Sequence, residues 1–272
     1  MTTATAAMES SRDEGAIPQY SLGMILLMFA WPLAWFSFLI YVIGPTLLRP
    51  DGSIPTWVVL MISFLGNGAE LAVALIVLRR EGYRLTLKAL RDRINWRFPD
   101  VWWKWVAALV VFVVAFALSM FTGQFNAKLA TVPGFIPPDW FPAIMNPLVE
   151  VNSIQEAYPD VNLAGNFFFF LIEFVVYGAI FNVIGEELYY RGMLQPKMRG
   201  VFGKWAWLAN AIGFVLKHGY FRWNFPGILP GALAFSFAFG PLGSLPIAMI
   251  YHYLGNYLFP IILAVPVVFG AG

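Results

Sequence analysis

The chain contains no cysteine and few charged residues. Because none of its 272 residues is Cys, disulfides, thiolate nucleophiles and cysteine-based metal sites are all excluded. Charged residues make up 12% of the chain and hydrophobic residues 60%, whereas about a quarter of a typical soluble domain is charged. The composition therefore excludes an ordinary soluble domain and indicates a membrane protein.

Long runs with almost no charge recur along the chain. A helix of about 20 residues is needed to cross roughly 30 Å of hydrocarbon. We therefore expect an all-α, polytopic membrane helix bundle with about seven transmembrane helices, within a range of about six to eight. The expected spans are residues 20–44, 55–78, 101–121, 166–190, 203–221, 227–240 and 244–268.

Residues 1–16 are small and polar and predict a disordered N-terminal tail. The apolar run from Tyr20 to Gly44 is too long for a signal-peptide core, and no A-x-A cleavage site follows it. It is expected to be a retained first helix. No internal repeat or soluble domain is evident, so residues 17–272 are expected to form a single transmembrane domain.

Basic residues predict the orientation of the bundle. The loop after the second span holds Arg79, Arg80, Arg84, Lys88, Arg91, Arg93 and Arg97, and the loop after the fourth holds Lys197, Arg199 and Lys204. By the positive-inside rule both loops are cytoplasmic, and so is the N-terminus. With seven spans the C-terminus is external. Lys217 and Arg222 fall on the external side and fit this orientation less well.

The connection 122–165 is predicted to be external. It carries one base, Lys128, against Asp139, Glu150, Glu156 and Asp160. It also contains several prolines and large apolar residues. The segment could lie on the membrane surface or cover the entrance to a site, and the sequence leaves both readings open.

The only two histidines, His218 and His252, lie in strongly apolar stretches, as do Glu186 and Glu187. Ionisable groups inside a membrane are costly and usually functional. Glu187 and Arg191 are four residues apart, so they can pair on one helix face. That pairing leaves Glu186 available as a general base that activates water.

Two further pairs have helical spacing. Phe214 and His218 share one face, and so do His252 and Asn256. The His252–Asn256 pair could polarise a carbonyl and hold an oxyanion. It could instead provide hydrogen bonds between membrane helices.

Depth in the membrane links these residues. Turns near 200–203, 224–226 and 240–243 would bring Glu186, His218 and His252 to similar depths, at about 1.5 Å of rise per residue. They are therefore expected to converge with Asn256 in one site. Glu173 lies about 20 Å along the helix from Glu186 and is not expected to share it. For Asn67 and Glu70, structural pairing is the favoured reading, with support of the site as the alternative.

The motifs E-E-x-x-x-R, F-x-x-x-H and H-x-x-x-N occur in that order, each in a predicted span. This pattern resembles the CAAX protease and bacteriocin-processing family, which includes the type II CAAX prenyl endopeptidases and bacterial "abortive infection" proteins. The resemblance covers a motif-bearing core of about residues 166–260. The matching residues are Glu186, Glu187, Arg191, Phe214, His218, His252 and Asn256.

The resemblance implies an intramembrane endopeptidase with a conical cavity open to the cytoplasm. The residue matching Glu186 would activate water with help from that matching His218, and those matching His252 and Asn256 would form the oxyanion hole. Glu187, Arg191 and Phe214 would be supporting residues. No cofactor is favoured, although Glu186, His218 and His252 could form a zinc site with an open position.

The expected partners are the lipid bilayer and a peptide or lipidated-protein substrate, such as a CAAX-type C-terminus or a bacteriocin or signalling precursor. No nucleic-acid partner is expected. The expected location is a membrane, of prokaryotic character, with the active site towards the cytoplasmic side. The alternatives from other classes are a non-catalytic membrane scaffold or chaperone that retains the fold, and a small transporter.

Overall fold

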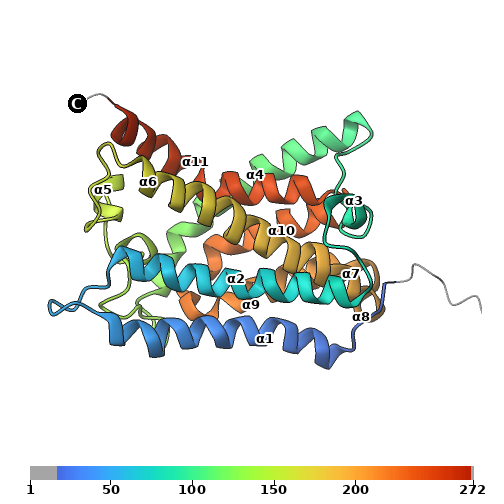
Figure 1. Cartoon of the computed structure of the whole chain (residues 1–272), viewed down its shortest axis with the longest axis horizontal. Helices are drawn as coiled ribbons and strands as arrows, with labels where there is room; N and C mark the ends of the chain where they lie inside the picture. Colours follow the sequence, from blue (N-terminus) through green and yellow to red (C-terminus); the bar gives the residue numbers. More distant parts are fainter. Residues whose placement is uncertain (1–16, 271–272) are drawn as a thin grey trace, which may run out of the picture.

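The computed structural model describes residues 17–270, and every regular element in that range is helical. This confirms the all-α class. The predicted disordered tail, residues 1–16, lies outside the described residues. Figure 1 shows the long helices running side by side along the length of the molecule, with short helices at both ends.

Five helices are long and apolar enough to cross a membrane. They are Leu22–Leu47, which begins as α1 (Leu22–Phe38); α2 (Thr56–Arg80); α4 (Trp102–Leu129); Phe167–Lys197, which begins as α6 (Phe167–Phe170) and ends as α7 (Gln195–Lys197); and α11 (Leu245–Phe269). The shorter helices are α3 (Leu87–Leu90), α5 (Ile154–Ala157), α8 (Arg199–Phe202), α9 (Ala206–Lys217) and α10 (Phe225–Phe239). A polytopic helix bundle is therefore confirmed.

The fifth predicted span, 203–221, is shorter than expected, whereas the sixth, 227–240, has about its predicted length, and neither forms a full crossing. Helix α9 has 12 residues and α10 has 15, which at 1.5 Å per residue falls well short of roughly 30 Å. A 3₁₀ segment, His218–Asn224, joins them, and Phe221 has non-helical backbone angles there. Helix α10 packs against α4, α9 and α11, so this shorter pair lies within the bundle.

Polar caps and glycines set several helix ends. The side chains of Ser21, Asn166 and Ser244 each accept a hydrogen bond from a backbone N–H in the first helical turn. Gly203 (φ 53°) and Gly243 (φ 70°) adopt the left-handed conformation that glycine tolerates best. Both lie in turns that the sequence predicts.

The two ends of the bundle differ in charge. Helices α3, α7 and α8 gather at one end, and α5 and the start of α6 lie at the other (Figure 1). At the first, basic end, Glu81 pairs with Arg93 at 2.8 Å and with Lys197 at 2.7 Å. Burial opposes ionisation of Glu81, but these two cations outweigh it and lower its pKa.

At the opposite end, Asp160 fastens the connection 122–165 to the start of α2. Its carboxylate accepts a hydrogen bond from the backbone N–H of Thr56 at 3.1 Å and pairs with Arg49. Burial would raise the pKa of Asp160, but the hydrogen bonds from Thr56 and Arg49 lower it overall. The connection is therefore held against the helices rather than lying free of them.

Candidate active site

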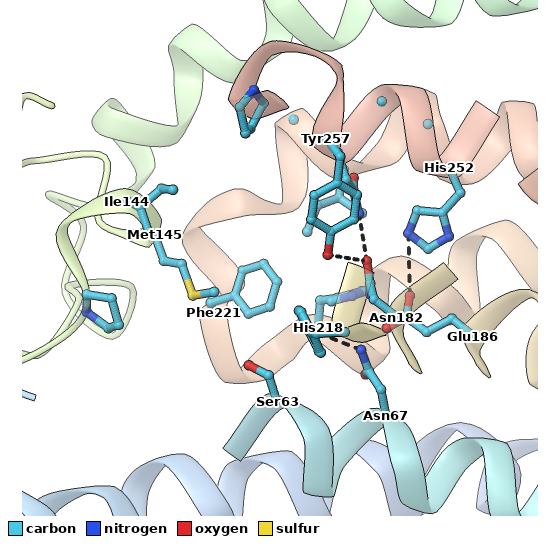
Figure 2. Close-up of a pocket in the computed structure, with 18 of the residues that line it drawn as sticks. Ser63, Asn67, Ile144, Met145, Asn182, Glu186, His218, Phe221, His252 and Tyr257 are labelled. Atoms are coloured by element: carbon cyan, nitrogen blue, oxygen red, sulfur yellow. Dashed lines mark hydrogen bonds and ion pairs between the residues drawn. The ribbon is translucent and has the colours of Figure 1, made fainter. Parts of the chain in front are cut away.

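A cavity of about 490 Å³ lies between α2, the Phe167–Lys197 helix, α4, α10 and α11. Most of its wall is apolar. The polar side chains on the wall include Ser63, Asn67, Glu173, Asn182, Glu186, His218, His252 and Asn256. Figure 2 shows Asn182, Glu186, His218 and His252 pointing towards one region of this cavity.

Glu186 lies where the Phe167–Lys197 helix changes its winding. Residues Leu171–Ile184 and Glu187–Leu194 form wide π turns on either side of it. Such turns are rare and often accompany functional sites. The side chain of Glu186 lines the cavity although the residue is only 3% exposed. The helix therefore presents this carboxylate to a largely enclosed space.

Glu187 forms the predicted pair with Arg191. The guanidinium Nη1 lies 2.9 Å from Glu187 Oε1, and both side chains are fully buried. The Arg191 guanidinium also lies 4.1 Å from the centre of the Phe214 ring, a cation–π contact. Phe214 thereby packs between Arg191 and the rings of His218 and His252.

Lys217 is the main feature of the site that the sequence reasoning missed. Its Nζ lies 2.7 Å from Glu186 Oε1 and 3.4 Å from Glu70 Oε1, with no side-chain exposure. Tyr190 donates a 2.6 Å hydrogen bond to the same oxygen of Glu70. The positive-inside rule counted Lys217 as a loop residue on the wrong side of the membrane. A lysine inside an apolar span usually pairs with a buried acid, so its position in the sequence could have indicated such a partner. Glu70 is paired, and because its cation also holds Glu186, this pairing supports the site as well.

His252 lies between the two adjacent glutamates. Its Nδ1 is 2.9 Å from Glu187 Oε1, and its Nε2 is 3.7 Å from Glu186 Oε2. An ionised carboxylate only accepts hydrogen bonds, so this contact assigns the Nδ1 proton to His252. Nε2 is left facing the free oxygen of Glu186.

His218 is oriented by its own helix. Its Nδ1 lies 2.7 Å from the backbone carbonyl of Phe214. Since a carbonyl accepts, Nδ1 carries the proton and Nε2 of the neutral ring is an acceptor. His218 lines the cavity and is 7% exposed. Both histidines are thus held through Nδ1, which leaves Nε2 for chemistry.

Asn256 and His252 line the same cavity but have different partners. Asn256 Nδ2 donates to Asn182 Oδ1 at 3.2 Å, and the Tyr257 hydroxyl donates to the same oxygen at 3.1 Å. The first bond fixes the Asn256 amide, and the second holds Asn182, which Figure 2 shows beside Tyr257. Tyr257 is the next residue after Asn256, but no sequence spacing between Tyr257 and Asn182 indicated that their side chains would be hydrogen-bonded.

Two further polar residues reach the cavity. Asn67 donates to the Tyr177 hydroxyl at 3.3 Å, and Glu173 accepts from the Tyr158 hydroxyl at 3.0 Å. Both Asn67 and Glu173 line the same cavity as Glu186. Glu173 contacts none of the motif residues, but it lines the same cavity, which extends along the helix that carries both glutamates.

The connection 122–165 begins later than predicted because α4 continues to Leu129. Trp140, Phe141, Ile144 and Met145 of this connection line the cavity. Of the two open readings, the segment therefore covers part of the site. The cavity reaches from the motif residues towards the end of the bundle opposite the basic loops.

Within residues 17–270, no group of three His, Asp or Glu side chains is arranged to hold a metal ion. Glu186 Oε1 is paired with Lys217, and His252 Nδ1 with Glu187. The atoms left free are Glu186 Oε2 and Nε2 of both histidines, so a zinc site formed by Glu186, His218 and His252 stays the alternative to a metal-free site.

Comparison with known proteins identifies the segment that carries these residues. Residues 168–258 match the family described as type II CAAX prenyl endopeptidase Rce1-like. This match covers about a third of the chain, includes all three motifs and agrees with the core of the resemblance, residues 166–260. No curated protein and no solved structure matches the chain.

Proposed function

We propose that the protein is an intramembrane endopeptidase of the glutamate type, starting from the match of residues 168–258 to the type II CAAX prenyl endopeptidase Rce1-like family. One observation carries the proposal. Glu186 Oε1 is paired with Lys217, while Oε2 faces His252 Nε2 at 3.7 Å on the cavity wall. An ionised, oriented carboxylate oxygen beside an imidazole is suited to general-base chemistry.

In the first step, a water on the cavity side of Glu186 attacks the carbonyl carbon of the substrate peptide bond. Glu186 Oε2 takes a proton from this water as the C–O bond forms. Lys217 keeps the other carboxylate oxygen engaged, so the base is fixed in place. His218 Nε2 faces the same cavity and accepts a hydrogen bond from the attacking water.

The tetrahedral intermediate places a negative charge on the former carbonyl oxygen. The Asn256 amide, held by Asn182, is one donor to this oxyanion. His252 is the second donor when its ring carries a proton on Nε2. This Nε2 lies 3.7 Å from Glu186 Oε2, so the ring faces the reacting centre. Collapse of the intermediate breaks the C–N bond, and Glu186 returns its proton to the leaving nitrogen.

The substrate class follows from the lining of the cavity. Its wall is largely aliphatic and aromatic, with rings such as Phe36, Phe116 and Phe235. It suits an apolar, membrane-tethered or lipidated peptide better than a soluble polar one. Prenylated CAAX-type C-termini and bacterial peptide precursors both meet this description. The bilayer supplies the surroundings from which such a substrate arrives.

Depth supports a site nearer the cytoplasm. From Glu186 to the basic end at Lys197 is about 16 Å by helical rise, against about 28 Å to Phe167. Positive-inside charge makes the basic end cytoplasmic. The cavity nevertheless extends towards the opposite end of the bundle, where residues of the connection 122–165 line it.

The absence of cysteine makes the orientation directly measurable. Single cysteines at Lys88, in the basic loop, and at Asp139, in the connection 122–165, can each be labelled in sealed vesicles. We expect an impermeant maleimide added outside right-side-out vesicles to label Asp139→Cys and to spare Lys88→Cys. Labelling of Lys88→Cys alone would reverse the orientation.

Peptide cleavage tests the proposed activity. The purified protein is incubated with membrane-tethered and farnesylated peptides, and products are identified by mass spectrometry, for wild type, Glu186→Ala and His218→Ala. Cleavage that resists chelators and disappears in Glu186→Ala is the expected result. Cleavage abolished by chelators and restored by Zn²⁺, or unchanged in Glu186→Ala, would contradict the glutamate mechanism.

A further inference from the structure

The buried glutamates of the bundle differ in how their charge is balanced. Four of them have a cationic side chain within 4 Å: Glu70 and Glu186 share Lys217, Glu187 pairs with Arg191, and Glu81 pairs with Arg93 and Lys197. Glu173 is 8% exposed and makes no salt bridge to any residue in the range 17–270. Its partner is the neutral Tyr158 hydroxyl at 3.0 Å.

An acid without a countercharge at membrane depth is costly, and such groups usually mark a site for a ligand or ion. Glu173 lines the cavity, whose described wall contains no Lys or Arg. A cation brought in by a ligand would therefore meet Glu173 without a competing protein cation. The aromatic rings of Tyr158, Phe174 and Tyr177 line the same cavity, and such faces also attract a positive charge.

We propose that Glu173 is a specificity subsite that binds a positively charged nitrogen of the peptide substrate, either a Lys or Arg side chain or a free amino terminus. The inference rests on the proposed function for the identity of the ligand as a peptide. Glu186 then marks the cleaved bond and Glu173 the charged residue, at two points along one cavity.

The separation of the two glutamates sets the expected spacing. Thirteen helical positions correspond to at most about 20 Å, because the π turns of Leu171–Ile184 advance less per residue than an α-helix. An extended peptide advances about 3.3 Å per residue. The charged nitrogen is therefore expected within about six residues of the cleaved bond, once the reach of a lysine side chain is included.

Binding to an inactive variant tests this subsite without turnover. In the Glu186→Ala background, the affinities of two fluorescent, N-acetylated, membrane-tethered apolar peptides are compared. One carries a single Lys and the other Gln at the same position, and the Lys is moved one residue at a time. A third peptide has Gln and a free amino terminus. Because of a charge-assisted hydrogen bond, the cationic peptide whose nitrogen reaches Glu173 should bind about tenfold or more tightly than the neutral Gln peptide.

Matched variants assign that preference to Glu173. Glu173→Gln should abolish it, while Glu173→Asp, which keeps the charge, should retain part of it and so controls for folding. Glu150→Gln removes an exposed acid from the connection 122–165 and should leave the preference intact. A preference unchanged in Glu173→Gln, or absent at every Lys position and at the amino terminus, would overturn the subsite.

The outcomes for the subsite and for the enzyme remain distinguishable. Cleavage of the neutral Gln peptide by the wild type tests the peptidase without Glu173. If that peptide is cleaved in a Glu186-dependent manner but no cationic preference exists, the subsite fails and the proposed function stands. If cationic peptides bind through Glu173 and none is cleaved, the proposed function fails and the binding site stands.

Discussion

Helix α4 and the Phe167–Lys197 helix are similar in length and apolarity but lie in different surroundings. They have 28 and 31 residues and mean hydropathies of 2.5 and 2.2 over their most apolar windows, yet 11% of that window is buried in α4 against 33% in the other helix. In α4 only Ala108 is buried. The Phe167–Lys197 helix instead buries Glu173, Glu186, Glu187 and Arg191.

This comparison shows that hydropathy locates the membrane but not the site. An apolar helix can face lipid along most of its length, as α4 does, because nothing in its sequence requires a protein partner. Buried ionisable residues must be paired or solvated, so they dictate which helix lies at the centre. Changes on α4 are therefore expected to have smaller effects than changes at residues that pack around the Phe167–Lys197 helix.

The largest expected effect on stability comes from Lys217→Met. This change leaves Glu70 and Glu186 buried without their shared cation, which should cost about 3–5 kcal/mol. The matched change on α4 is Lys104→Met, which breaks a solvent-exposed pair with Asp100 and should lower stability far less. Thermal unfolding in detergent measures both. Equal losses in the two variants would refute the contrast, and Glu70→Gln should partly rescue Lys217→Met.

Next in size is a loss of activity without a comparable loss of stability. Asn256→Ala removes a proposed oxyanion donor, so kcat should fall by about 10²–10³-fold while KM changes little. The control on α4 is Asn126→Ala. The Asn126 side chain accepts a hydrogen bond from the backbone N–H of Gly227, and the variant loses it. That variant should lose some stability and retain its kcat. A normal kcat in Asn256→Ala would remove this residue from the oxyanion hole.

A smaller effect is expected from pH at the basic end. The pKa of Glu81 is lowered in the folded protein, since Arg93 and Lys197 outweigh burial. A lowered pKa stabilises the fold above the ordinary value of 4.5, and this contribution is lost as pH falls through the lowered value. The Tm difference between wild type and Glu81→Gln should therefore be full near neutral pH and shrink below about pH 4.5. A difference that grows on acidification would contradict the assignment.

The smallest effect is expected on the exposed face of α4. Leu109 is 64% exposed, so Leu109→Ala should change stability by no more than about 0.5 kcal/mol. Leu78 of α2 is fully buried, and Leu78→Ala should cost about 2–5 kcal/mol. Unfolding of the two variants under one set of conditions measures the difference. A large loss in Leu109→Ala would indicate a protein partner on α4.

Local rules predicted part of this arrangement. The Glu187–Arg191 pair follows from a spacing of four residues, and the turns at Gly203 and Gly243 follow from glycines between apolar runs. The length of α9 did not follow, because the residues after Lys217 include Tyr220 and Trp223, which are apolar enough to continue a span. The change to 3₁₀ winding there is a tertiary effect.

Contacts between helices were the part that the sequence could not supply. Lys217, Glu70 and Glu186 come from three helices, and their meeting depends on how each is rotated. The π turns on both sides of Glu186 change that rotation relative to a regular α-helix. For the same reason, the contact of His252 with Glu187, in addition to its place beside Asn256 on the cavity wall, was not expected.

The most direct test of the central claim is a single turnover in H₂¹⁸O, with mass spectra of the product and of the peptide that contains Glu186. If Glu186 acts as a base, one ¹⁸O atom enters the new carboxyl group of the product and none enters Glu186. Incorporation of ¹⁸O into the Glu186 carboxylate would show a covalent acyl intermediate on this residue, and would contradict direct attack by water.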